Sequence, residues 1–183
     1  MIDDLLDASR AHSGERLVIK PAECNVTDLA LALVEDISQK EGERFVLDAP
    51  EPIHGFADCD RVRQALHNLI ENAVKYGSDD SPVTIRLLSS DGRMQLSVHN
   101  YGDPLPAEEQ RSPFQAFRRT SSAEKSGKKG WGLGLVLVQA IAEAHGGVVT
   151  LESTLEEGTT FTIDILQDVR EFHAGVKKQP GRP

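Results

Sequence analysis

Two carboxamides and an ammonium group recur at helical spacing near the middle of the chain, at Asn68, Asn72 and Lys75. Side chains three and four residues apart lie on the same face of a helix, so these three share one polar face. An amide oxygen is a hard ligand that suits Mg²⁺, and a lysine meets phosphate as a point charge. The set therefore suits a phosphate-bound metal. A solvated helix face is the alternative that this helix alone leaves open.

The helix that must position these side chains is expected over residues 61–77. Asp58 or Asp60 can cap its start, and Gly77 can end it. Its other face is apolar at the same three- and four-residue spacing, with Val62, Ala65, Leu66, Leu69, Ile70, Ala73 and Val74. The polar face is thus carried by a helix whose apolar side packs into a core.

Two glycine-containing stretches complete the candidate site. Residues 98–106 follow a predicted strand, where Gly102 lets the backbone turn and Asn100 stands at the strand end. Residues 130–135 precede a helix, whose N-terminal N–H groups and dipole favour an anion. The glycine spacing fits neither a Walker loop nor a dinucleotide fingerprint. A plain turn and a flexible hinge are the respective alternatives.

An irregular stretch over residues 100–130 is longer than an ordinary loop. Between Phe117 and Gly130 it carries five basic side chains against one glutamate: Arg118, Arg119, Lys125, Lys128 and Lys129 against Glu124. A solvated charged loop is the usual interpretation of such a run. Because this run adjoins the glycines, we interpret it as a lid that contacts polyphosphate.

Composition and charge exclude several classes of protein. The 183 residues are 39% hydrophobic and 27% charged, as in a soluble globular domain, and the formal charge of −9 argues against generic nucleic-acid binding. No apolar run is long enough to span a membrane and no signal peptide begins the chain, so we expect a cytoplasmic protein. Cys24 and Cys59 lack metal-like spacing and catalytic context. We predict ordinary thiols rather than a disulfide.

The remaining elements predict an α/β sandwich of two layers. Strands are expected at residues 17–20, 45–47, 83–88, 94–99, 148–153 and 159–166, and further helices at residues 26–39 and 133–145. Asp91-Gly92 marks a hairpin turn, and Gly146-Gly147 stops the last helix. A mixed, mostly antiparallel sheet covered on one face by three helices is the expected fold. Residues 169–183 are expected to form a disordered tail.

Together these motifs resemble the ATP-binding catalytic domain of sensor histidine kinases, in the superfamily of gyrase, chaperone, histidine-kinase and mismatch-repair ATPases. The resemblance covers residues 17–168, and four motifs follow the order of the family: residues 68–76 match the N box, 114–118 the F box, 130–135 the second glycine box and 158–161 the late Gly-Thr turn. It implies a Bergerat-type fold with an ATP lid, binding of MgATP, and phosphoryl transfer in two-component signalling.

By this resemblance, Asn72 coordinates the Mg²⁺ that bridges the phosphates, Asn68 assists, and Lys75 contacts phosphate. Gly132 and Gly134 would offer backbone N–H groups to the phosphates. The other residues implied to border the nucleotide are Tyr76, Asn100, Gly102, Phe117, Arg118, Gly130, Leu133 and Thr160, with Thr160 near the floor of the adenine pocket.

The first glycine box departs from the family pattern. The family has Asp-x-Gly-x-Gly, whose aspartate accepts a hydrogen bond from the adenine amino group, whereas this chain has Asn100-Tyr-Gly102-Asp-Pro104. An amide oxygen still accepts that bond but lacks the charge, a loss of about 1 kcal/mol. Pro104 stiffens the loop. We expect weaker or altered adenine binding, and kinases joined to bacterial phytochromes look similar here.

The resemblance also implies partners. A phospho-accepting histidine has characteristic surroundings that are missing around all six histidines: His12, His54, His67, His99, His145 and His173. We expect the acceptor on a dimerisation domain whose last helix ends within residues 1–16, so the chain would bind MgATP without labelling itself. A response regulator is the other expected partner. The isolated chain is expected to be a monomer or a weak dimer.

Hydrolysis of ATP is disfavoured. Hydrolysing relatives carry a glutamate base at the position of Asn68, and an amide cannot take a proton from water. Glu71 follows Asn68 by three residues but precedes Asn72 by one, so it points about 100° away from Asn72. Two alternatives to a histidine kinase stay open: a degenerate domain of the same fold that binds a partner or response regulator, and a serine/threonine-directed kinase of the anti-sigma type.

Overall fold

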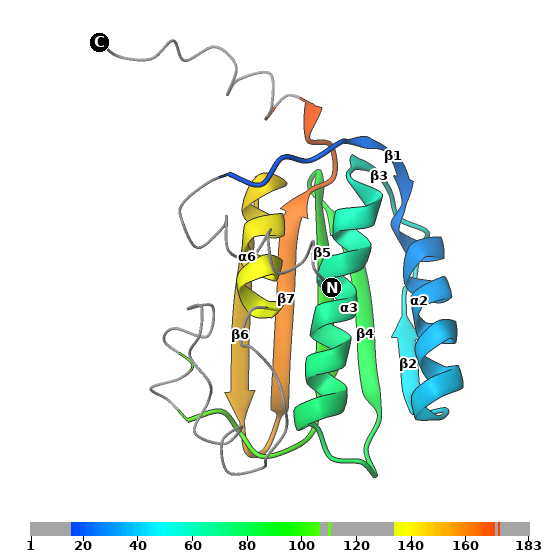
Figure 1. Ribbon diagram of the computed structural model, residues 1–183, viewed down its shortest axis with the longest axis vertical. Coiled ribbons are helices and arrows are strands. Elements are labelled where there is room, and N and C mark those ends of the chain that lie inside the picture. Colours follow the sequence, from blue (N-terminus) through cyan, green and yellow to red (C-terminus); the bar gives the residue numbers. More distant parts are fainter. Residues whose placement is uncertain (1–15, 107–109, 111–133, 171, 173–183) are drawn as a thin grey trace.

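The computed structural model describes residues 16–106, 110, 134–170 and 172 (Figure 1). This part of the chain forms two layers, with three helices lying on one face of a sheet. The helices are α2 (Val26–Glu41), α3 (Cys59–Tyr76) and α6 (Gly134–Ala144). The predicted two-layer α/β architecture is confirmed.

The main sheet has five strands in the order β2-β4-β5-β7-β6. They are β2 (Phe45–Asp48), β4 (Val83–Ser90), β5 (Arg93–Asn100), β7 (Gly158–Leu166) and β6 (Val148–Thr154). The β2–β4 pair is parallel and the other three pairs are antiparallel. The mixed, mostly antiparallel sheet is therefore as predicted. The β4–β5 hairpin turns at Asp91 and Gly92 with positive φ angles of 51° and 72°, which explains the Asp-Gly pair.

Alternation along the strands decides which face packs under the helices. On β5 the buried side chains are Met94, Leu96 and Val98, and they pair in register with Ile165, Ile163 and Phe161 of β7. The apolar stripe of α3 packs in the same core. Asn100 continues the buried row of β5 to its last residue, with only 6% of its surface exposed. A polar side chain thus ends an otherwise apolar row.

A second, two-stranded sheet was not foreseen. It pairs β1 (Ala22–Asn25) with β3 (His54–Ala57) in antiparallel orientation. The predicted strand at residues 17–20 is wrong, because Val18 is 81% exposed and the N–H of Lys20 donates to the Asp58 carboxylate instead of to a strand. The chain after β7 also pairs here, through the N–H of Val169 and the carbonyl of Phe56 at 3.1 Å.

The two cysteines form a disulfide between β1 and the first residue of α3. The prediction of free thiols is therefore wrong. Cys24 and Cys59 are 35 residues apart in sequence, and their Cα atoms lie 5.6 Å apart. This proximity depends on how β1 packs against α3, which a residue spacing cannot reveal. In the described part of the chain, no helix has the length and apolar character needed to cross a bilayer.

Candidate functional site

The polar face of α3 meets the first residue of α6. The amide nitrogen of Asn68 donates to the Gln64 carbonyl at 3.0 Å, which leaves the Asn68 oxygen facing α6. That oxygen lies only 3.1 Å from the position that a Cβ on Gly134 would occupy. Glycine at position 134 therefore lets the start of α6 approach the Asn68 acceptor. Backbone N–H groups at the start of a helix generally lack partners within the helix, so the Asn68 acceptor lies beside the end of α6 at which such donors are expected.

Asn72 and Lys75 continue this face by one and two turns, and both are partly buried. The Lys75 ammonium lies 4.9 Å from the centroid of the Tyr76 ring, within cation–π range. Glu71 is turned away, as predicted: its side chain is 64% exposed and lies 3.7 Å from the His67 ring nitrogen. The face thus presents amide oxygens and a cation, but no carboxylate from Glu71.

Asn100 supplies a buried acceptor at the end of β5. Its amide nitrogen donates to the carbonyl of Tyr101 at 3.3 Å, and that carbonyl also accepts from the N–H of Ser78 at 2.7 Å. The amide is therefore oriented with its oxygen free. Within the described ranges, no group donates a hydrogen bond to this oxygen. A buried acceptor without a donor costs free energy of folding. The Asn100 oxygen is therefore a candidate to accept a hydrogen bond from a ligand.

Two glycines bring the end of α3 against the end of β5. A Cβ on Gly77 would lie 3.2 Å from the Asn100 amide nitrogen and would collide with the Ala73 carbonyl. A Cβ on Gly102 would lie 2.8 Å from the Tyr76 carbonyl. Because neither residue has a side chain, backbone packs directly on backbone. This close approach places Asn100 beside the last turn of α3.

The structure places the first two threonines of β7, Thr159 and Thr160, on opposite faces of the sheet. Thr160 points away from the helices, where its hydroxyl lies 3.0 Å from the His99 ring, whereas Asn100 faces the helices. Thr159 is 4% exposed and pairs in register with Asn100. Thr159 is thus the threonine next to the candidate acceptor. Strand alternation could have found it, because Phe161 is a core residue and shares the face of Thr159.

A buried serine ties the loop after β5 to the sheet, and sequence reasoning missed it. The Ser153 hydroxyl accepts from the N–H of Leu105 at 3.0 Å and lies 2.7 Å from the Thr159 hydroxyl. The Gln110 amide donates to the carbonyls of Leu105 and Ser153. Leu105 and Gln110 are therefore tied to the end of β6. Nothing local in the sequence marks Ser153, because its role depends on contacts from distant segments.

His99 lies on the outer face of the sheet beside this cluster. Burial lowers the pKa of its imidazole from the ordinary value of 6.5, and the negative charge of Glu157 partly opposes this shift. Its ring packs edge-on against Tyr101, with centroids 4.8 Å apart. His99 therefore packs at the end of β5 on the face of the sheet opposite the helices.

Several predicted site residues lie outside the described part of the chain: Phe117, Arg118, Gly130, Gly132 and Leu133. The F box and the lid lie there too. The structure places Asn68 against Gly134, with Asn72 and Lys75 further along the same face of α3. At the other end of α3 it brings Tyr76 against Gly102 and Gly77 against Asn100.

Residues 57–169 match the profile of the family described as histidine kinase-, DNA gyrase B- and HSP90-like ATPases. The chain belongs to this family. The matched segment runs from the end of β3 to just past β7 and includes every site residue described above. The family assignment agrees with the resemblance of the N box, F box and glycine boxes to sensor histidine kinases.

The similarity extends to full-length kinases of this ATPase family. The adaptive-response sensory kinase SasA of Synechococcus elongatus (strain ATCC 33912 / PCC 7942 / FACHB-805) is 33% identical over 166 residues, which are 88% of this chain and 42% of SasA. Full-length ShkA, crystallised in complex with AMPPNP, aligns with a TM-score of 0.75 and 26% identity over 90% of this chain and 34% of ShkA. This chain therefore spans less than half the length of either kinase.

An isolated domain aligns over nearly its whole length. The nucleotide-free catalytic domain of the histidine kinase ThkA gives a TM-score of 0.70 with 26% identity, covering 82% of this chain and 97% of that domain. The chain is thus an ATP-binding domain of the histidine-kinase type, and the fold is the Bergerat fold that the motifs implied.

Proposed function

We propose that this domain binds MgATP along the polar face of α3 and presents the γ-phosphate to a histidine on a dimerisation domain in two-component signalling. The proposal rests on the buried amide oxygen of Asn100, to which no residue in the described part of the chain donates, together with the amide face of α3. The two contacts that define the site, at Asn68 and at Gly77, are nine residues apart, or roughly 13 Å along a helix. That span suits an extended nucleoside triphosphate.

Asn100 would recognise the adenine base. Its oxygen is oriented as an acceptor by the bond from its nitrogen to Tyr101, so it would accept from the exocyclic amino group of adenine. Thr159 lies beside it with a buried hydroxyl. A neutral amide forms a weaker bond than the carboxylate that the family usually has there. The same orientation opposes guanine, whose corresponding group is a carbonyl that would face another acceptor.

Asn72 and Asn68 would hold the phosphate end. Their amide oxygens are the hard ligands that Mg²⁺ prefers, and the oxygen of Asn68 already faces the start of α6. Bound Mg²⁺ would neutralise charge on the phosphates. Lys75 would add a positive charge, and the N-terminal N–H groups of α6 would donate to phosphate oxygens. These groups orient the nucleotide and stabilise charge without forming a covalent bond.

Transfer to an external acceptor is favoured over transfer to water. A hydrolysing site needs a base to take a proton from water, and Asn68 cannot do so. Glu71 lies 3.7 Å from the His67 ring, on the exposed side of α3. A serine/threonine-directed kinase and a partner-binding module share the fold, and the nucleotide and acceptor assays below separate them from a histidine kinase.

Calorimetric titration tests this proposal. MgATP is expected to bind at micromolar to sub-millimolar affinity, and ATP in EDTA more weakly. MgGTP is expected to bind about tenfold more weakly than MgATP or worse, since its base carbonyl would face the Asn100 oxygen. A chain that binds no nucleotide up to millimolar concentration would instead support the partner-binding module. If MgATP binds, phosphotransfer to a histidine-containing dimerisation domain, compared with transfer to serine substrates, identifies the acceptor.

A further inference from the structure

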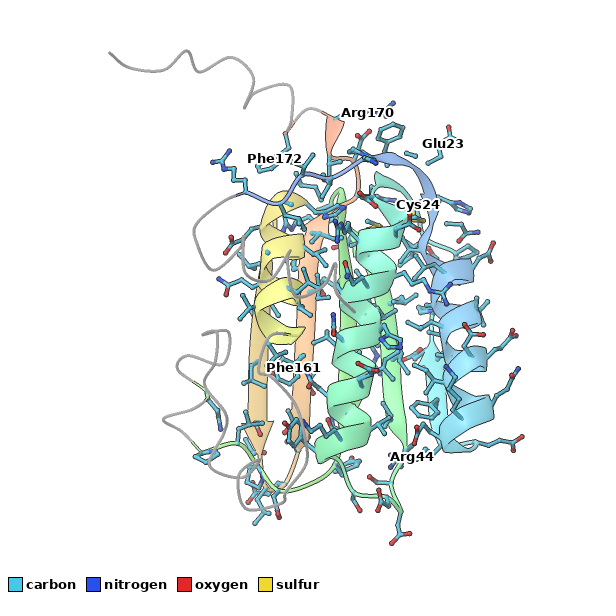
Figure 2. The ribbon with its side chains drawn as sticks, in the orientation of Figure 1. Glu23, Cys24, Arg44, Phe161, Arg170 and Phe172 are labelled. Carbon is cyan, nitrogen blue, oxygen red and sulfur yellow. A yellow bond between two sulfur atoms is a disulfide. The ribbon has the colours of Figure 1, made fainter. Side chains whose placement is uncertain are left out.

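The disulfide at the opposite end of α3 has one buried and one accessible side. Cys24 is only 3% exposed, on β1. Cys59 is half-buried and lines an open groove of about 590 Å³. Figure 2 labels Cys24 beside the N-terminal end of α3. Cys59 lines the groove and Cys24 does not, so a small molecule in the groove would meet the Cys59 side of the bond.

The groove has the size of a small-molecule site. One wall is formed by Val18 and Lys20, which precede β1, and by Ala22, the first residue of β1, and the other is the first turns of α3. Its volume falls within the range of ligand pockets, roughly 300–1,000 Å³. Disulfides that solvent can reach exchange with small thiols, whereas disulfides buried on both sides resist attack while the protein is folded. Because Cys59 is half-buried and lines the groove, we infer that the Cys24–Cys59 bond is of the first kind.

We propose that Cys24 and Cys59 form a thiol–disulfide exchange site for a low-molecular-weight thiol that enters this groove. The thiolate attacks the Cys59 sulfur, the bond to Cys24 breaks, and the Cys24 sulfur leaves with the electron pair and takes up a proton. The product is a mixed disulfide at Cys59 and a thiol at Cys24. A second thiolate then attacks the sulfur of the small thiol and releases Cys59, so that two small thiols are oxidised to their disulfide as the protein pair is reduced.

The bond holds together a defined part of the fold. The segment between the two cysteines contains α2, β2 and β3 (Figure 1), and the bond links this segment covalently to the start of α3. Cys59 precedes Asn72 by thirteen residues, roughly 20 Å along the helix. Exchange therefore acts on the anchoring of the α2 side and leaves the polar face of α3 in place. The inference does not depend on the proposed nucleotide site.

The test uses glutathione as the probe thiol. The folded chain is equilibrated with mixtures of reduced and oxidised glutathione, quenched with acid, and mapped by peptide mass spectrometry. We expect the pair to interconvert between disulfide and dithiol in the folded state, with the mixed disulfide at Cys59. A bond that glutathione opens only after unfolding, a mixed disulfide at Cys24, or a pair that stays reduced in oxidised glutathione would each overturn the proposal.

Single variants separate the two sulfurs. Cys24→Ser leaves Cys59 as the only cysteine, and Cys59→Ser leaves Cys24, with circular dichroism confirming that both variants fold. In the folded state we expect Cys59 to form the glutathione adduct about tenfold faster than Cys24 or more, because Cys24 is buried. In guanidinium the two rates should converge. Equal rates in the folded variants would show that the groove gives no preferred access to Cys59.

Discussion

The N-terminal end of α3 is held by a disulfide and by hydrogen bonds between side chains and backbone, whereas its C-terminal end is held by backbone packing at glycines. At the first end, Cys59 is cross-linked to β1, and Asp58 accepts from the N–H groups of Lys20 and Arg61 at 2.7 and 3.2 Å. The N–H of Asp58 donates to the ring of His145, which is fully buried and lies 2.8 Å from the Ile141 carbonyl. The polar groups at this end thus pair with one another.

The C-terminal end has the opposite character. Gly77 and Gly102 bring chain segments into contact without side chains, and Asn100 keeps a buried oxygen to which no described residue donates. The two ends of α3 therefore have different roles. Paired polar groups fix the position of the helix in the fold, whereas the Asn100 oxygen, held beside the tightly packed glycines, keeps its bonding capacity for a ligand.

The largest effect is expected from removing the cross-link at the anchored end. A closed loop of 35 residues corresponds to about 3–4 kcal/mol of stability in the chain-entropy account of disulfides. Reduction, or the double change Cys24→Ser and Cys59→Ser, should therefore lower the free energy of unfolding in urea by that order. MgATP affinity should stay within about twofold, since the polar face of α3 is remote. An unchanged urea midpoint would show that the bond does not stabilise the fold.

The next effect concerns the cap of α3. Asp58→Ala removes a buried carboxylate that accepts two N–H groups, so we expect a loss of about 2 kcal/mol in the free energy of unfolding. Asp60→Ala is the matched control, because Asp60 is exposed in the same turn and should cost only about 0.5 kcal/mol. Equal losses for the two variants would contradict the assignment of Asp58 as the cap.

The ligand end is tested by neighbouring residues on α3. Asn72→Ala should lower Mg²⁺-dependent affinity for ATP by about tenfold or more, roughly 1.4 kcal/mol, because a metal ligand is lost. Glu71→Ala should leave that affinity unchanged, since the Glu71 side chain is 64% exposed and faces His67. Calorimetry measures the affinities, and thermal unfolding checks the fold. If Asn72→Ala binds MgATP like the unaltered chain, the metal site is assigned to the wrong residue.

The smallest effect depends on pH and on His99. Because burial lowers its pKa from 6.5 in the folded state, the unfolded chain binds more protons just below that pH. The free energy of unfolding should therefore fall as the pH drops below 6.5 and level off below the folded pKa. His99→Gln should remove this part of the pH profile. A profile unchanged by that substitution would exclude His99 as the cause.

The sequence predicted those parts of the molecule that depend on local periodicity. The extent of α3, its amide face and the Asp91-Gly92 hairpin follow from spacing and turn chemistry, because each concerns residues close in the chain. The motif order also identified the fold family. The amide face was recognisable because polar residues at helical spacing stand opposite an apolar stripe.

The features that it missed depend on contacts between distant segments. The β1–β3 sheet and the Cys24–Cys59 bond need β1 to pack against segments more than 25 residues away. Ser153 carries no local signal, since its partners are Leu105 and Thr159. Thr159 was different, because strand alternation marks it, and the family motif drew attention to Thr160 instead. Pairing across the fold, rather than propensity, decides these positions.

Hydrogen exchange with and without MgATP tests most directly whether the N-terminal end of α3 anchors the helix and its C-terminal end binds nucleotide, because one experiment reports on both ends. We predict that MgATP slows exchange in residues 68–77, in residues 100–105 and at the start of α6, while β1, β3 and the first turn of α3 exchange as before. Protection confined to the anchored end, or exchange unchanged by MgATP throughout, would contradict the assignment of the amide face and Asn100 as the nucleotide site.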